Sequence, residues 1–225
     1  MRPLRESVLA ALLWRYGCHS AMLLLSLFAE GRPAPHLPDT LLTHIPRIGW
    51  VAAHNYLFWL VCYLPPALWL WRRDPRAFRH FLYLGGALSL LRGLTVGLTG
   101  LGPVDGPDVN VGLGGPALWA AWLTLLNPFS SLFGNAAHVY LTKDLFFSGH
   151  VSTTFLLWLY CRGRGWLGRA ALLGHWITVA VVFLSHLHYS IDVLGAWAIT
   201  YSLYVWAERR WPFAAAEGAG ESTPG

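Results

Sequence analysis

The sequence predicts an all-α membrane protein, a polytopic bundle of six transmembrane helices with one short interfacial helix. Three observations support this fold class. Apolar residues make up 55% of the 225 residues. Only 12% of the residues are charged, whereas a soluble domain carries about 25%. The chain also contains 13 Trp, a residue that gathers at membrane interfaces.

The predicted spans follow from stretches of about 20 mostly apolar residues, the length that crosses a bilayer. Six stretches qualify, with edges defined to within several residues: 8–28, 51–71, 81–101, 141–161, 166–186 and 187–207. Segment 102–116 is rich in Gly, Pro and Asp and is predicted to be a loop. Segment 117–126 contains two Trp and is predicted to be a short helix in the interface. The small, polar tail 214–225 is expected to be disordered.

Arginines fall in alternate loops of this arrangement. They precede the first span, separate the second from the third and the fourth from the fifth, and follow the sixth. The four groups are Arg2 and Arg5; Arg72, Arg73, Arg76 and Arg79; Arg162, Arg164 and Arg169; Arg209 and Arg210. Because cytoplasmic loops are enriched in Lys and Arg, we expect these loops to be cytoplasmic. The net charge of +5 then reflects membrane anchoring, and we expect no nucleic-acid binding.

The chemically reactive residues cluster at the opposite, non-cytoplasmic face. Ser148-Gly149-His150 lies at the outer end of the fourth span, and His188 and Asp192 lie at the turn between the fifth and sixth. On a helix, residues four apart are neighbours, so the Asp192 carboxylate would orient the His188 imidazole. We therefore predict His188 as a nucleophile and His150 as general acid and base.

A phosphate group suits this set of residues. Exposed N–H groups at the start of the fourth span, around Ser148 and Gly149, would bind a phosphate oxygen, and Arg92 in the third span would neutralise the remaining charge. The His and Asp spacing matches no HExxH or CxxC pattern, so we expect no metal and no cofactor. The three cysteines all fall in apolar stretches and are predicted to be core residues.

At these residues the sequence resembles the sphingomyelin synthase family, within the type 2 phosphatidic acid phosphatase superfamily. The family's third motif, Cys-Gly-Asp-x-x-x-Ser-Gly-His-Thr, corresponds to Thr-Lys-Asp-Leu-Phe-Phe-Ser-Gly-His-Val at 142–151. Its fourth, His-Tyr-Thr-x-Asp-Val, corresponds to His-Tyr-Ser-Ile-Asp-Val at 188–193. Two weaker matches are the family's Arg-x-x-Thr, which corresponds to Arg-Gly-Leu-Thr at 92–95, and its Pro-Leu-Pro-Asp, which corresponds to His-Leu-Pro-Asp at 36–39. The similarity runs from about residue 36 to 206.

The resemblance implies a two-step phosphotransfer without metal, in one six-helix transmembrane catalytic domain, residues 1–213. His188 would take the head-group phosphate from a phospholipid such as phosphatidylcholine and pass it to ceramide or a related lipid alcohol. His150 would protonate the leaving diacylglycerol and later deprotonate the acceptor. The motif residues expected to bind the substrate are Arg92, Asp144, Ser148, Gly149 and Tyr189. The expected partners are therefore a phospholipid donor and a lipid acceptor, and the oligomeric state stays open.

The sequence also departs from the family pattern. Lys143, Val151, Leu187 and Ser190 replace the typical Gly, Thr, Asp and Thr, which leaves the head group and acceptor open. We expect a short, bacterial-type member without a sterile alpha motif domain. An Ala-, Gly-, Arg- and Trp-rich composition is typical of a GC-rich bacterial genome, so we expect the bacterial inner membrane.

Two other functions stay open. A lipid phosphate phosphatase or a phospholipase C-like hydrolase would use the same three catalytic residues with water as acceptor. Phosphatases of this group also carry Lys-x6-Arg-Pro before Ser-Gly-His, and that pattern is missing from this sequence, which favours transfer. A non-catalytic membrane transporter or assembly factor would need neither histidine.

Overall fold

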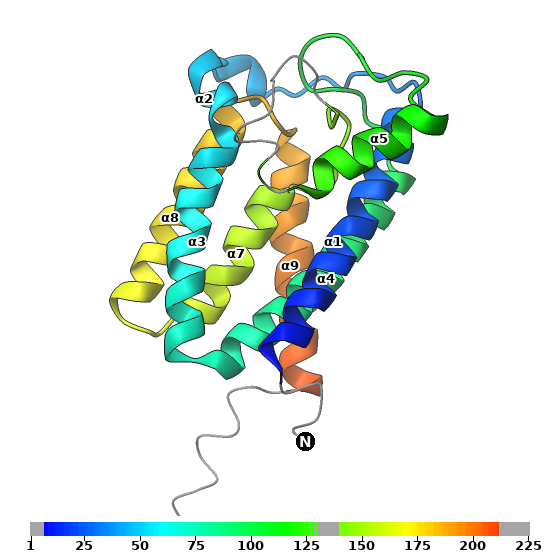
Figure 1. Cartoon of the computed structure of the whole chain (residues 1–225). Coiled ribbons are helices and arrows are strands. Elements are labelled where there is room, and N and C mark those ends of the chain that lie inside the picture. Colours follow the sequence, from blue (N-terminus) through cyan, green and yellow to red (C-terminus); the bar gives the residue numbers. More distant parts are fainter. Residues whose placement is uncertain (1–6, 128, 130–139, 212–225) are drawn as a thin grey trace, which may run out of the picture.

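Six helices form a bundle, in which they stand side by side and run in alternating directions, in the residues that the computed structural model describes, 7–127, 129 and 140–211 (Figure 1). They are α1 (Val8–Glu30), α3 (Asn55–Arg73), α4 (Pro75–Leu98), α7 (Gly149–Cys161), α8 (Trp166–Leu184) and α9 (Ser190–Arg210). Three shorter helices lie at one end: the 3-10 helix η2 (Leu42–His44), α2 (Gly49–Ala53) and α5 (Gly115–Leu126). The predicted all-α class is confirmed.

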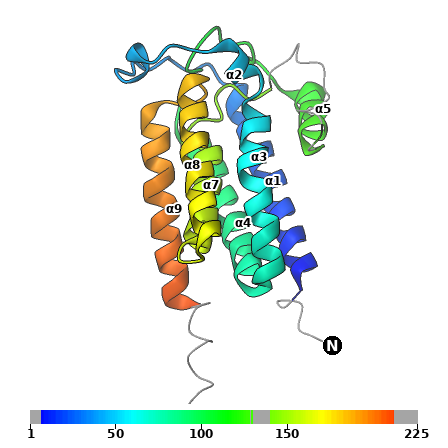
Figure 2. The same ribbon diagram turned by 90° about the vertical axis from the view of Figure 1, so that its left-hand side faces the viewer.

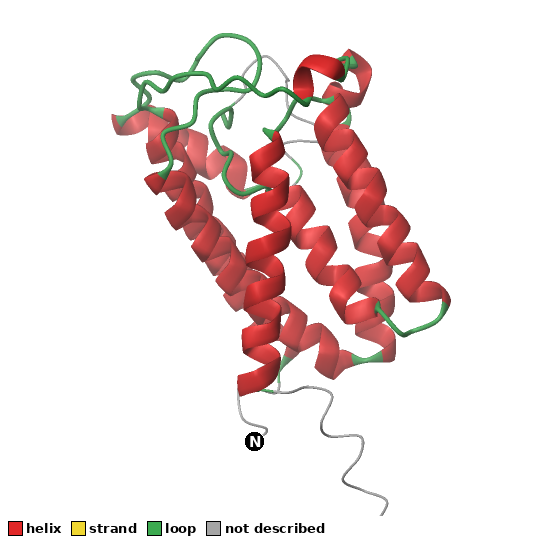
Figure 3. Cartoon of the chain, turned by 180° about the vertical axis from the view of Figure 1, so that it is seen from behind, coloured by secondary structure: helices red, strands yellow, loops and turns green. Residues whose placement is uncertain are grey.

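The two ends of the bundle differ. At one end, here called the short-turn end, Asp74 links α3 to α4, residues 162–165 link α7 to α8, and α9 ends (Figure 2). At the other, the loop end, longer connections run across the helices: 31–48, 99–114, 140–148 and 185–189 (Figure 3). The described arginines of the predicted basic groups all lie at the short-turn end, or in the helix turns next to it.

Within the part of the chain that the structure describes, three helices are long and apolar enough to cross a membrane by length and composition: α1, α4 and α8. The predicted span 141–161 differs most from the structure, because only its part from Gly149 is helical. A helix of 13 residues is about 20 Å long, less than the roughly 30 Å of a bilayer core. The predicted helix 117–126 is confirmed as α5. The predicted disordered tail, 214–225, lies outside the described residues.

The short helix α7 lies inside the bundle, where it packs against α3, α4, α8 and α9. Its side chains are accordingly among the most buried of the described chain, with Val151, Leu156, Leu157 and Tyr160 no more than 1% exposed. α7 begins well below the upper ends of α3 and α8 (Figure 1). The segment 140–148 therefore descends into the bundle to reach it.

A buried carboxylate anchors the start of that segment. Glu30, at the end of α1, is 0% exposed and accepts backbone N–H groups of Thr142 at 2.7 Å and Lys143 at 2.5 Å. It also accepts a side-chain N–H of Asn110 at 2.9 Å. Lys143 in turn forms an ion pair with Asp108 at 2.7 Å. Buried charges need such partners, so these contacts determine where the chain enters the bundle.

A second carboxylate fastens segment 31–48 to the start of α9. Asp39 Oδ2 accepts the backbone N–H of Ser190 at 2.6 Å. Its Oδ1 accepts the backbone N–H groups of Leu41 and Leu42. Nearby, His186 Nε2 lies 2.9 Å from the carbonyl oxygen of Ile45. An acceptor at a helix start satisfies N–H groups that have no partner within the helix. Asp39 therefore acts as a remote cap for α9.

Hydrogen bonding alters the acidity of this carboxyl. Partial burial alone would raise the pKa of Asp39, but the N–H groups of Ser190 and Leu42 outweigh that effect and hold the pKa below its usual value. The ionised form is thus favoured in the folded state. Its contribution to stability is full above the unfolded-state pKa of about 3.9 and is lost as the pH falls through the lower, folded-state pKa.

Asp39→Asn is expected to lower the free energy of unfolding by about 1 kcal/mol, the typical value of a helix cap. Thermal unfolding of wild type and variant measures this difference. It should be constant between about pH 5 and 7 and shrink below about pH 4, because Asp39 is then protonated first in the unfolded protein and, at lower pH, in the folded protein. Asp105→Asn, which removes an exposed ion pair with Arg47, is the control and should change stability little. A difference that grows in acid would contradict the assigned role.

Candidate active site

His188 and Asp192 face each other at the start of α9. Asp192 Oδ2 lies 3.4 Å from His188 Nδ1, and the two residues are only 0% and 4% exposed, respectively. The same oxygen accepts the backbone N–H of Tyr189 at 2.9 Å, at a helix start where the dipole favours negative charge. Because Nδ1 faces the carboxylate, we infer that it carries the proton. The Nε2 lone pair is then available for attack.

The second imidazole comes from the start of α7. The backbone N–H of Ser148 donates to the backbone carbonyl of Asp192 at 3.1 Å, which ties the start of α7 to the first turn of α9. The Ser148 hydroxyl accepts the N–H of Val151 and caps the helix. The ring centroids of His150 and His188 are 6.5 Å apart. The structure therefore brings together all three residues that the sequence predicted as catalytic.

Arg92 supports the segment that leads to His150. Its Nε donates to the carbonyl oxygen of Phe147 at 2.6 Å. Its two terminal nitrogens donate to the carboxylate and to the carbonyl oxygen of Asp144, both at 2.7 Å. A fourth N–H faces Met22 Sδ at 3.2 Å. A guanidinium has five N–H groups, so most of the donors predicted to bind phosphate are already used within the protein.

Gly149 and Asp144 complete this support. A β-carbon at Gly149 would lie 3.0 Å from Arg92 Nε and 3.1 Å from its Cζ, so the glycine allows Arg92 to lie against the start of α7. The Asp144 carboxylate also accepts the hydroxyl of Ser26, in α1, at 2.7 Å. Sequence reasoning missed Ser26, since a serine in an apolar helix carries no distinguishing pattern.

Tyr189 lies in the loop framework of the site. It is 2% exposed, and its hydroxyl contacts the carbonyl oxygens of Gly102 at 3.2 Å and Pro103 at 3.1 Å. The same hydroxyl accepts the backbone N–H of Leu37 at 3.1 Å. Three loop-end segments are thereby joined directly beside His188. These contacts give Tyr189 a positioning role next to the site.

Trp59, in α3, is a neighbour of His150 that sequence reasoning missed. Their ring centroids are 5.7 Å apart, and Tyr63 stacks on the indole at 4.9 Å. The indole N–H of Trp59 is buried, and no acceptor for it is found within the described part of the chain. Leaving a buried donor without a partner costs about 1–3 kcal/mol. Such a donor beside the His150 imidazole is suited to donate a hydrogen bond to an oxygen atom of an incoming ligand.

Two histidines and a carboxylate in this geometry offer a nucleophile, the group that orients it and a separate proton carrier. This set suits two successive displacements at one electrophilic centre. Among the described residues, no three His, Cys, Asp or Glu side chains are grouped as around a metal ion.

Comparison with known proteins agrees with this geometry. The family model described as PAP2 superfamily C-terminal matches residues 143–209. That range contains Asp144, Ser148 to His150 and His188 to Asp192. It thus includes both helix starts that supply the candidate catalytic residues.

Curated relatives match over a longer range. Phosphatidylcholine:ceramide cholinephosphotransferase 1 of Homo sapiens is 28% identical over 192 residues, which cover 76% of this chain and 44% of the relative. The Rattus norvegicus protein of the same name is 26% identical over 190 residues, with 76% and 43% covered. Sphingomyelin synthase-related protein 1 of Homo sapiens is 28% identical over 182 residues, again with 76% and 43% covered.

The chain spans less than half the length of these relatives. The family model nevertheless covers the two histidines and the aspartate that converge in the structure. The chain thus matches the PAP2 superfamily C-terminal model over residues 143–209, and 76% of it is similar to a phosphatidylcholine:ceramide cholinephosphotransferase and to a sphingomyelin synthase-related protein.

Proposed function

We propose that the protein is a membrane lipid phosphotransferase. It would move a phospholipid head-group phosphate, such as the phosphocholine of phosphatidylcholine, to ceramide or a related lipid alcohol. The observation that carries the proposal is the pair of imidazoles 6.5 Å apart, one of which faces the buried Asp192 carboxylate. The similarity to a phosphatidylcholine:ceramide cholinephosphotransferase supports the same reaction class.

In the first step, His188 Nε2 attacks the phosphorus of the donor. A phosphorus–nitrogen bond forms, the phosphorus–oxygen bond to diacylglycerol breaks, and His150 gives its proton to the leaving oxygen. Reacting atoms begin about 3–3.5 Å apart, and a general acid must lie within about 2.6–3.2 Å of its oxygen. The separation of the two rings accommodates a phosphoryl group between them. Asp192 stabilises the positive imidazole that forms.

In the second step, the acceptor replaces diacylglycerol. His150, now neutral, takes the proton of the acceptor's primary hydroxyl as the oxygen attacks phosphorus. The phosphorus–nitrogen bond breaks, and its electron pair returns to His188 Nε2. The protein ends in its starting protonation state.

In this scheme Arg92 and Asp144 position the start of α7, and Ser148 and Gly149 place its N–H groups near the phosphate.

We place all six helices of the bundle across the membrane, within a catalytic domain that comprises residues 1–213. The short-turn end then lies in the cytoplasm. Three of the helices fit a span by length and composition, and α7 packs among its neighbours in the bundle. The arginines at the short-turn end support this orientation. Non-helical backbone is tolerated at membrane depth where protein buries it, as Arg92 does for segment 144–147. The histidines then face the non-cytoplasmic side of what we propose is a bacterial inner membrane.

Burial favours a lipid over water as the acceptor. His188 is only 4% exposed and Asp192 is 0% exposed, so bulk water has little access to the nucleophile. In the proposed reaction, the lipid hydroxyl enters the site from the bilayer. A hydrolase would use the same three residues, and product analysis separates the two reactions.

The direct test incubates purified protein with choline-labelled phosphatidylcholine, with and without ceramide. Transfer predicts a labelled sphingolipid that forms only with ceramide. Labelled phosphocholine as the main product under both conditions would favour hydrolysis. If neither product formed with phosphatidylcholine or with other phospholipid donors, a non-catalytic role would replace the proposal.

His188→Ala is expected to lower the rate of transfer by roughly 10⁴-fold or more, because the nucleophile is removed. His150→Gln should lower it by about 10²–10⁴-fold, the usual contribution of a general acid or base. The labelled-lipid assay measures both effects. His44→Gln, an exposed histidine at the same end, is the control and should keep wild-type activity. Wild-type turnover in His188→Ala would rule out the assigned nucleophile.

Trp59→Phe is expected to reduce kcat/KM by roughly 10–100-fold. The change keeps an aromatic ring but removes the buried N–H that we assign to a phosphate oxygen, and a hydrogen bond to a charged group is worth about 1.5–3 kcal/mol. Trp69→Phe, in the same helix but packed against Trp166 at the short-turn end, serves as the matched control. Equal kcat/KM values for the two variants would show that the Trp59 N–H does not contact the substrate.

A further inference from the structure

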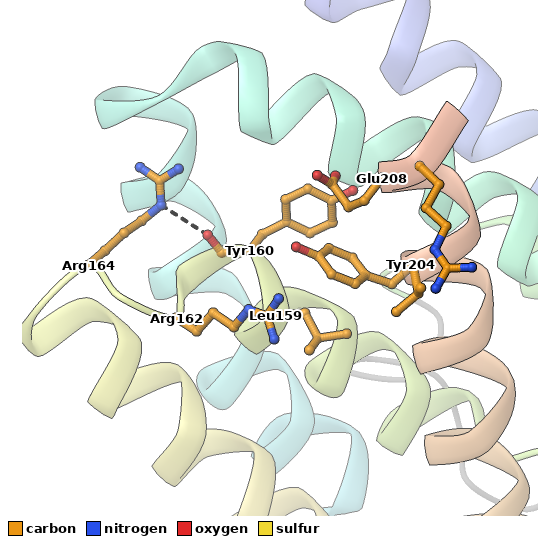
Figure 4. Close-up of a pocket in the computed structure, with 8 residues that line it drawn as sticks. Leu159, Tyr160, Arg162, Arg164, Tyr204 and Glu208 are labelled. Carbon is orange, nitrogen blue, oxygen red and sulfur yellow. Dashed lines mark hydrogen bonds between the residues drawn. The ribbon is translucent and has the colours of Figure 1, made fainter. Parts of the chain in front are cut away.

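A cavity lies at the short-turn end, at the opposite end of the bundle from the two histidines. It has a volume of about 480 Å³ and lies between the end of α7 and the last turns of α9. In Figure 4 the rings of Tyr160 and Tyr204 lie against each other, with Glu208 beside them and Arg162 and Arg164 close by. We call it the arginine cavity, because Arg209 also lines it.

Two of its three arginines have no ion-pair partner among the described residues. Arg164 is already engaged, since it forms an ion pair with Asp74 at 2.6 Å and donates to the carbonyl oxygen of Tyr160 at 3.0 Å. Arg162 and Arg209 are exposed, and neither forms an ion pair with any residue that the structure describes. The guanidinium of Arg162 lies 5.3 Å above the ring of Tyr204.

The lining also contains one acidic residue, Glu208, whose charge offsets one of these two positive charges. The carboxylate of Glu208 lies 3.7 Å from His80 Nδ1, in α4, and 20% of its side chain is exposed. Arg162 and Arg209 therefore leave the open cavity with an excess of positive charge. A cavity of this charge selects an anion.

Exposed tryptophans place the cavity at the level of lipid head groups. Trp166 is 56% exposed, Trp206 is 50% exposed and Trp211 is 60% exposed, and all three lie at the short-turn end of α8 and α9. Tryptophan side chains exposed in this way are typical of the boundary between bilayer and water. Basic pockets between transmembrane helices at this depth bind lipid phosphates.

We propose that the arginine cavity binds the phosphate group of an anionic membrane lipid, with Arg162 and Arg209 as its ligands. Guanidinium groups donate paired N–H bonds that match phosphate oxygens. Free phosphate offers the same oxygens, but the exposed side chains of Trp166, Trp206 and Trp211 favour a ligand held in the bilayer. This lipid is distinct from the donor at the histidines, and the proposal does not depend on the reaction assigned there.

The test uses the full-length protein in detergent micelles, titrated with phosphatidylglycerol, phosphatidylcholine or inorganic phosphate. Thermal unfolding and native mass spectrometry report binding. Phosphatidylglycerol is expected to raise the unfolding temperature and to give bound-lipid peaks, since a ligand of the folded state stabilises it. Inorganic phosphate should do so much less at equal concentration. Stabilisation by phosphatidylcholine, the proposed donor, should be the same in wild type and in the cavity variant described next.

Two double variants of equal charge locate the site. Arg162→Gln with Arg209→Gln should weaken phosphatidylglycerol binding by roughly tenfold or more, because charge-assisted hydrogen bonds are lost. Arg169→Gln with Arg210→Gln removes two exposed arginines of the same end that do not line the cavity, and it should bind as wild type does.

Equal weakening in both double variants would overturn the proposal, because it would show diffuse attraction to a basic surface. Equal stabilisation of wild type by inorganic phosphate would also overturn it, because it would identify a soluble ligand. This last comparison uses wild-type protein, so it decides the question even if the cavity variant fails to fold.

Discussion

The two histidines meet because Asp192 is bonded to the starts of both helices that position them. Its carbonyl oxygen accepts the N–H of Ser148, and its carboxylate accepts the N–H of Tyr189 and faces His188. A fully buried carboxylate is costly without full compensation, and its Oδ1 has no hydrogen-bond partner among the described residues. In the proposed reaction, the positive imidazole formed at His188 supplies that compensation. The stabilisation then develops as the reaction proceeds, which is what accelerates a chemical step.

The shortness of α7 is the second constraint on the site. A helix that starts inside the bundle needs an irregular segment above it, and the backbone carbonyls of that segment need donors. Arg92 supplies them, and Gly149 leaves the space that its guanidinium occupies. The arginine that the sequence suggested as a phosphate ligand is thus mainly a support for the start of α7. The Arg92 guanidinium still places positive charge beside the proposed phosphate position, because it packs against Gly149.

Residue spacing and apolar composition within single segments predicted the helices and the His188–Asp192 pair well. The spacing of His188 and Asp192 places them together on any helix, and apolar composition alone was enough to identify α1 and α8. Contacts between residues far apart in the sequence determined the features that the sequence did not predict. The apolar residues Leu145 and Phe147 resemble part of a span, but Arg92 takes the backbone carbonyl of Phe147 and the helix begins only at Gly149. Asp39 caps a helix 151 residues away, and no sequence pattern within one segment reveals such a partner.

Detection of a phosphohistidine at His188 is the sharpest test of the proposed two-step transfer. The protein would be mixed with phosphatidylcholine in the absence of acceptor, quenched under alkaline conditions that preserve phosphohistidine, digested and analysed by mass spectrometry. We expect a phosphocholine adduct on His188 that disappears when ceramide is added before the quench. An adduct on His150, or an adduct on His188 that persists while the labelled sphingolipid accumulates, would contradict it.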